Sequence, residues 1–129
     1  MLAKSRWVCA LAAAAAILAA VGPLAAAAPA GQVTVTGEVI DSACYIKDGS
    51  HGESHRGCMQ SCADNGVPLA ILEEGTNHVV WVASKADMDT PNKDLRPFAA
   101  RRVTVKGTWA ERGGTKLLLI DSVEAAKGK

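Results

Sequence analysis

The sequence predicts a mainly β domain in which five strands form a small barrel, with a short helix inserted after the first strand. Apolar and polar residues alternate with a period of two in several segments, which is typical of strands with one buried face. Two of these segments carry a glycine at the same point of their pattern, as strands do where they bend sharply. The best helix signals fall within residues 54–64, after the first strand.

Residues 1–30 have the features of a secretory signal peptide, in which a positively charged start precedes an apolar stretch. Lys4 and Arg6 supply the charge, and an Ala-rich run and further small residues follow. We expect cleavage after Ala28 or Ala30. The alternative is an uncleaved membrane anchor, but the apolar run is shorter than the span of about 20 residues that a bilayer requires. The protein is therefore expected to be periplasmic or secreted.

The mature chain, residues 31–129, is expected to form one domain without a membrane span. It has 12 basic and 13 acidic residues, a formal net charge of −1, and only one Phe, one Tyr and two Trp. This composition argues against nucleic-acid binding, which requires a basic surface or a stacking platform. The sequence contains no Ser-His-Asp arrangement or phosphate-binding loop, so a binding or accessory module is favoured over an enzyme.

The first strand is predicted from Val33, Val35 and Val39, which alternate with threonine and glutamate. Gly37 interrupts this alternation, which indicates a bulge or a sharp bend. The helix of residues 54–64 should follow, with Ser54 as its N-cap and Gly66 as its left-handed stop.

The remaining strands are predicted from the same alternation and from apolar runs bounded by turns: residues 67–72, 78–83, 102–109 and 116–123. The first two of them form a hairpin. Between the two pairs, Pro91 and Pro97 limit any helix to a turn or two.

The same short sequence pattern occurs in the first and fourth predicted strands. Val33-Thr-Val-Thr-Gly37-Glu-Val39 and Val103-Thr-Val-Lys-Gly107-Thr-Trp109 share the pattern V-T-V-x-G-x-apolar. Five strands, two of them interrupted by glycine, with an insertion after the first, resemble an OB-fold, a small Greek-key barrel. The resemblance covers residues 32–124 and implies that the first and fourth strands lie side by side.

Metal-binding side chains are concentrated in the Cys/His loop at residues 44–62, which holds every cysteine outside the first ten residues and two of the three histidines. In a helix over 54–64, His55, Cys58 and Cys62 are spaced i, i+3 and i+7 and therefore share one face. We expect Cys44 to approach that face from the end of the first strand. The sequence thus predicts a Cys3His metal site formed by Cys44, His55, Cys58 and Cys62.

Thiolates and imidazole are ligands for zinc and for copper(I), so either metal ion is a candidate partner, and another exported protein is a further one. One alternative is a disulfide from Cys44 to Cys58 or Cys62, which would stabilise a small domain by about 3 kcal/mol. Another is a thiol-disulfide redox protein that uses Cys58 and Cys62, with Cys44 as the resolving thiol. His51 is either an exposed residue or an alternate ligand to His55.

The chain also resembles a group of small exported bacterial proteins that share three short motifs. Here these are Asp41-Ser-Ala-Cys44-Tyr45 (D-x-x-C-Y), His55-Arg-Gly-Cys58-Met-Gln-Ser-Cys62 (H-x-x-C-x-x-x-C) and Gly66-Val-Pro68 (G-x-P). That group has no established activity. The resemblance therefore supports the site without implying a function.

Overall fold

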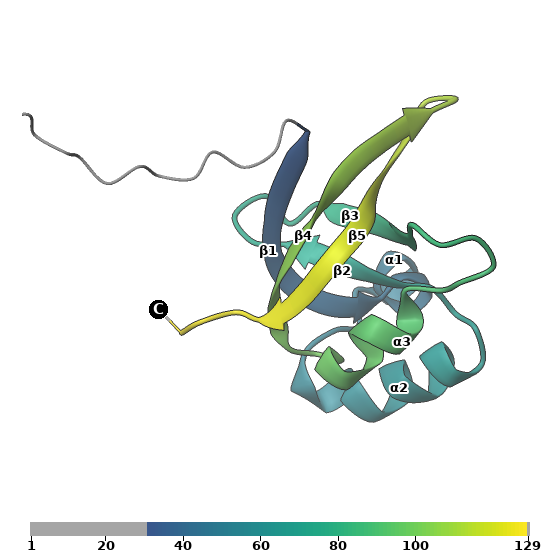
Figure 1. Ribbon diagram of the computed structural model, residues 1–129. Helices are drawn as coiled ribbons and strands as arrows, with labels where there is room; N and C mark the ends of the chain where they lie inside the picture. The colour runs from purple at the N-terminus through teal and green to yellow at the C-terminus, as the bar shows by residue number, and fades with distance from the viewer. Residues whose placement is uncertain (1–30, 129) are drawn as a thin grey trace, which may run out of the picture.

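Five strands form a closed ring in the computed structural model, which describes residues 31–128. The predicted signal peptide lies outside the described residues. The strands are β1 (Gln32–Asp41), β2 (Leu69–Glu73), β3 (Val79–Ser84), β4 (Arg102–Arg112) and β5 (Thr115–Ala125). They are hydrogen-bonded in the order β1-β2-β3-β5-β4, and β1 also pairs with β4 (Figure 1). The prediction of a mainly β fold with a short helix after the first strand is confirmed.

Strand β1 is shared between two neighbours, and Gly37 lies where its partner changes. Residues 32–38 pair with β4 and residues 37–41 pair with β2, both antiparallel. The first and fourth strands are therefore adjacent, as the resemblance to an OB-fold implied. A Cβ atom at Gly37 would overlap the Leu72 carbonyl oxygen, and one at Gly107 would overlap the Leu119 carbonyl oxygen. Both glycines are thus required by the close approach of a neighbouring backbone.

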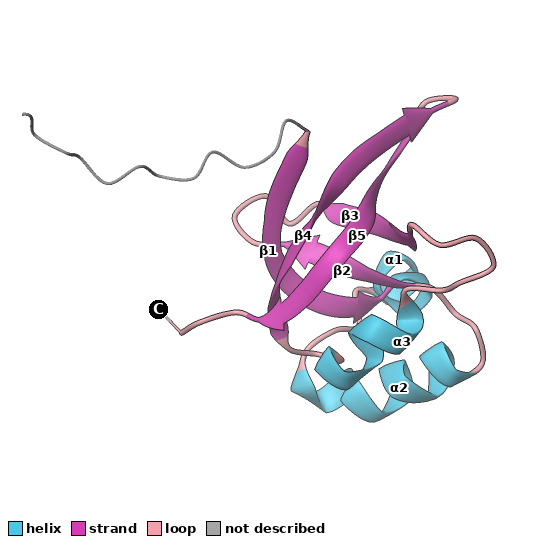
Figure 2. Ribbon diagram, in the orientation of Figure 1, coloured by secondary structure: helices cyan, strands magenta, loops and turns pink. Residues whose placement is uncertain are grey.

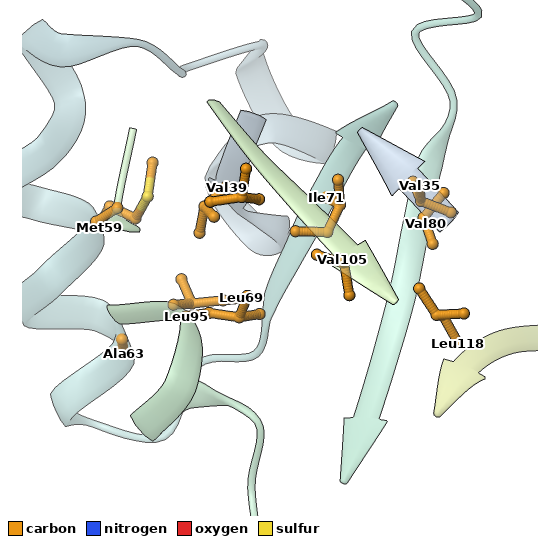
Figure 3. Close-up of a cluster of buried hydrophobic side chains, with 12 residues drawn as sticks. Val35, Val39, Met59, Ala63, Leu69, Ile71, Val80, Leu95, Val105 and Leu118 are labelled. Carbon is orange, nitrogen blue, oxygen red and sulfur yellow. The ribbon is translucent and has the colours of Figure 1, made fainter. Parts of the chain in front are cut away.

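The hydrophobic core fills the ring and continues into the helices at one end of it. Figure 3 shows Met59 and Ala63 beside Leu69 and Leu95 at this end. The buried side chains inside the ring come from every strand and include Val35, Val39, Ile71, Val80, Val103, Val105 and Leu118. Met59 is fully buried, which fixes the face of its helix that points into the protein.

The helices gather at this end of the ring (Figure 2). They are α1 (Ser42–Asp48), a 3-10 turn (Glu53–His55), α2 (Arg56–Asp64) and α3 (Asn92–Leu95), and a second 3-10 turn, Arg96–Phe98, follows α3. Within residues 31–128, no helix is long and apolar enough to cross a membrane.

The expectation that Cys44 extends from the end of a strand is wrong, because the chain enters α1 at Ser42. Asp41 is the N-cap of this helix, and its side-chain Oδ1 accepts a hydrogen bond from the Cys44 backbone N–H at 3.0 Å. Gly49, in the left-handed conformation, ends the helix. The predicted Cys/His loop is therefore largely helical.

The second helix also begins differently from the prediction. The 3-10 turn starts at Glu53, so Ser54 is already inside helical backbone and does not act as the N-cap. The preceding Gly52 donates its backbone N–H to Glu38 Oε1 on β1 at 2.6 Å. The predicted stop is confirmed, because Gly66 has a positive φ of 86° and Val67 N–H donates to the Cys62 carbonyl at 3.0 Å.

A buried amide holds α2, β2 and α3 together. Asn92 Oδ1 accepts from Leu69 N–H at 3.0 Å, and its Nδ2 donates to the carbonyls of Val67 and Ala63 at 2.9 and 3.3 Å. Asn92→Leu should therefore lower the free energy of unfolding by about 3 kcal/mol, because it removes all three hydrogen bonds. The Leu69 N–H and the Val67 carbonyl lose their Asn92 partner, whereas the Ala63 carbonyl keeps the Gly66 N–H. Urea denaturation measures this loss. Asn65→Ala, which removes an exposed amide bonded to one carbonyl, is the control and should cost far less.

Candidate metal centre

The predicted ligands come together around one sulfur atom. Ligand atoms of Cys44, His55 and Cys58 lie within 4.8 Å of one another, and those of Asp41, Cys44 and Cys62 form a second group by the same measure. We call these five residues the Cys44 cluster. Among the described residues, neither group contains all four predicted ligands, and Cys44 alone belongs to both.

Four elements position the cluster. Asp41 is the last residue of β1 and Cys44 lies in the first turn of α1, so the N-cap hydrogen bond fixes these two relative to each other. His55 ends the 3-10 turn, and Cys58 and Cys62 are one turn apart on α2. Packing of Met59 into the core orients α2.

The cluster extends from the protein surface into its interior. Cys58 is exposed, Cys44, His55 and Cys62 are half-buried, and Asp41 is fully buried. Two of its polar atoms, His55 Nε2 and Asp41 Oδ2, are buried without a hydrogen-bond partner. Such atoms are rare and costly in folded proteins. An unpaired imidazole nitrogen and an unpaired carboxylate oxygen beside thiols fit a set of metal ligands.

The Asp41 carboxylate controls the charge of the nearby thiols. Its proximity raises the pKa of Cys62 to about 12, and burial and Cys58 act in the same direction. Burial raises the pKa of Cys44, and the negative charge of Asp41 adds to this effect. Burial would also raise the pKa of Asp41 itself, but the hydrogen bond from the Cys44 backbone N–H, together with the nearby Cys62 and Cys44 thiols, outweighs it and lowers that pKa. At neutral pH the metal-free cluster therefore combines a carboxylate with protonated thiols at Cys44 and Cys62.

The three described cysteines are all free, so the disulfide considered as an alternative, from Cys44 to Cys58 or Cys62, is not formed. The alternate ligand His51 belongs to neither group. Its Nδ1 lies 3.2 Å from Glu38 Oε2, and its ring packs edge-on against Tyr45.

Comparisons with protein-family models, with curated proteins and with solved structures find no match for this chain. Functional inference therefore depends on the chemistry of the Cys44 cluster.

Asp41 is the member of the cluster that sequence reasoning missed. It belongs to the D-x-x-C-Y motif, and a signal was present, because Asp three residues before Cys44 and Gly49 beyond it are typical ends of a short helix. Since the apolar residues of β1 lead directly into Asp41, the sequence was interpreted as a strand ending at Cys44.

The high pKa of Cys62 predicts slow alkylation, because the thiolate is the reactive form. In reduced, metal-free protein at pH 8, iodoacetamide should modify Cys62 at least about 10-fold more slowly than the exposed Cys58. The rate at Cys62 should keep rising as the pH approaches 12.

Peptide mass mapping can follow both cysteines in one sample. Asp41→Asn removes the charge that raises the pKa of Cys62, so it should speed alkylation of Cys62 at pH 8. Equal rates at Cys58 and Cys62 in the unmodified sequence would contradict this electrostatic account.

Proposed function

We propose that this chain is an exported metal-binding module, an accessory or binding protein for zinc or copper(I), with Cys44, His55, Cys58 and Cys62 as metal ligands. The N-terminal pattern of charge, apolar run and small residues supports export. The closed five-stranded ring, with its first and fourth strands adjacent, supports an OB-like Greek-key barrel as the scaffold.

The observation that carries the proposal is the gathering of the Cys58 and Cys62 sulfurs and the His55 imidazole around the Cys44 sulfur, with His55 Nε2 buried and unpaired. Sulfur and imidazole nitrogen are preferred ligands of zinc, and Cys3His is an established structural zinc set. Copper(I) also favours thiolates, so the ligand set alone admits both metals.

A thiol-disulfide redox protein is the competing function, and the position of Cys58 and Cys62 one turn apart on α2 supports it. A redox-active pair requires an attacking thiol that ionises near the ambient pH. Cys62 cannot supply that attacking thiol, because its pKa is raised to about 12, so the attack would have to come from Cys58. Metal binding removes this difficulty, since a bound cation favours the deprotonated thiol.

The test is the metal content and intact mass of the protein recovered after export of the full-length chain. Native mass spectrometry under reducing conditions should show bound zinc or copper, and metal-free protein should take up either ion. His55→Ala should weaken this uptake, whereas His51→Ala, in a histidine outside the cluster, should leave it unchanged. If the reduced protein binds neither zinc nor copper, the proposal is excluded. A mass two hydrogens lower before reduction than after it would indicate a disulfide instead.

A further inference from the structure

We infer that the Cys44 cluster binds two divalent ions of the zinc class, with the Cys44 thiolate bridging them. This inference rests on the proposed function and extends it from a single Cys3His site to a site for two ions. The ligands of the first ion are Cys44, His55 and Cys58, and those of the second are Asp41, Cys44 and Cys62.

The first argument is geometric. A single tetrahedral site requires its four ligand atoms to converge on one point, with each about 2.0 to 2.3 Å from the metal. The four predicted ligands instead divide into two groups of close atoms, and Cys62 is grouped with Asp41 rather than with His55 and Cys58. The atom common to both groups is the sulfur of Cys44, and a thiolate sulfur has enough lone pairs to bind two ions.

The second argument is that a single ion in the first group would leave Asp41 unexplained. This carboxylate is fully buried, and its Oδ2 has no hydrogen-bond partner. Its Oδ1 already serves the α1 N-cap, so the capping role accounts for only one of its two oxygens. A buried acceptor facing two thiols is a suitable third ligand for a zinc-class ion.

The third argument is charge balance. Three thiolates and one carboxylate carry four negative charges, which two divalent ions neutralise and one does not. The neighbouring cations have other partners, since Arg56 pairs with Glu53 at 3.1 Å and Lys47 with Asp48 at 3.5 Å. Asp41 is fully buried, and a buried charge without compensation is expensive, so an ion in the second group would also compensate this carboxylate.

The ligand set of the second group also selects the class of metal. Zinc and its analogue cadmium accept sulfur, nitrogen and oxygen ligands, whereas copper(I) favours soft sulfur over carboxylate oxygen. Copper(I) should therefore occupy the sulfur-rich part of the cluster without using Asp41. The two ions should also differ in exchange rate, because the first group includes the exposed Cys58 and the second the fully buried Asp41.

The experiment is a titration of the reduced, metal-free exported protein with zinc or cadmium, followed by native mass spectrometry. The expected result is two bound metal ions per chain for the unmodified protein and for His51→Ala. One equivalent is expected for Asp41→Asn, in which asparagine preserves the N-cap, and for Cys62→Ser, whose thiol belongs only to the second group. A chelator should remove the two ions in two phases.

The outcomes separate this inference from the proposed function. One equivalent in the unmodified sequence, or two equivalents retained in both Asp41→Asn and Cys62→Ser, would overturn the two-ion site while leaving a metal-binding protein. No uptake of zinc, cadmium or copper(I) would overturn both. Circular dichroism of each variant shows whether its fold is retained, and the stoichiometry of the unmodified sequence tests the inference even where a variant does not fold.

Discussion

Cys44→Ala is expected to lower the affinity for zinc by at least about 100-fold, which is more than any other single cysteine substitution in the cluster. Loss of residues that merely support a metal ligand typically costs about 10- to 100-fold in affinity, so loss of a ligand should cost at least as much. Removal of Cys58 leaves the group of Asp41, Cys44 and Cys62 complete, and removal of Cys62 leaves the other group complete. Removal of Cys44 breaks both groups.

Competition with a chromogenic zinc chelator under reducing conditions measures these affinities. Cys58→Ala and Cys62→Ala are the matched comparisons, because each removes one sulfur from the same cluster. The half-buried Cys44 is not part of the hydrophobic core, so Cys44→Ala should remain folded by circular dichroism. Equal losses of affinity in the three variants would contradict the central position assigned to Cys44.

The strands could be predicted because their pattern is local. Apolar residues alternate with polar ones at Val33, Val35 and Val39. This period of two indicates which face of β1 is buried. The sequence pattern shared by the first and fourth strands was also informative. At both Gly37 and Gly107, a neighbouring carbonyl oxygen leaves no room for a Cβ atom. The shared pattern thus indicated two strands of similar curvature, and the resemblance to an OB-fold implied that they are adjacent.

The helical insertion was harder to predict, because its elements are short and depend on tertiary contacts. Helix α1 spans only seven residues, too few to show an apolar period, and its sequence continues that of a strand. The 3-10 turn that leads into α2 begins after Gly52, whose backbone N–H donates to Glu38 on β1, and no local pattern reveals this contact.

The candidate site could be predicted in its composition but not in its division into two groups. Clustering of cysteine and histidine in the sequence indicated which side chains would meet, and all four predicted ligands lie in the Cys44 cluster. Their division depends on α1, which carries Cys44 to a position between α2 and the buried Asp41. A strand ending at Cys44, as predicted, would not use Asp41 as a helix cap and would give no reason to include it.

Gly37→Ala is expected to lower the free energy of unfolding by about 3 kcal/mol or more, because the added methyl group would occupy the position of the Leu72 carbonyl oxygen. A carbonyl oxygen in a paired strand cannot move aside as a flexible side chain can, so β1 and β2 would have to separate locally. Gly37 pairs with Glu73 on β2 and with Val103 on β4, so both ladders would be disturbed. Urea denaturation of the reduced, metal-free protein measures the loss.

Two further glycines make this prediction specific. Gly107→Ala should destabilise in the same way, because its methyl group would meet the Leu119 carbonyl oxygen. Gly57→Ala, in α2, should instead stabilise by about 0.5 kcal/mol, because alanine favours helix and, apart from the chain neighbours and the backbone of the helix itself, no atom lies within 4 Å of the added carbon. If all three variants lost stability equally, general intolerance of alanine would be the better explanation. Stability changes of opposite sign for Gly37→Ala and Gly57→Ala would show that the close approach of neighbouring strands in the ring sets the requirement for glycine.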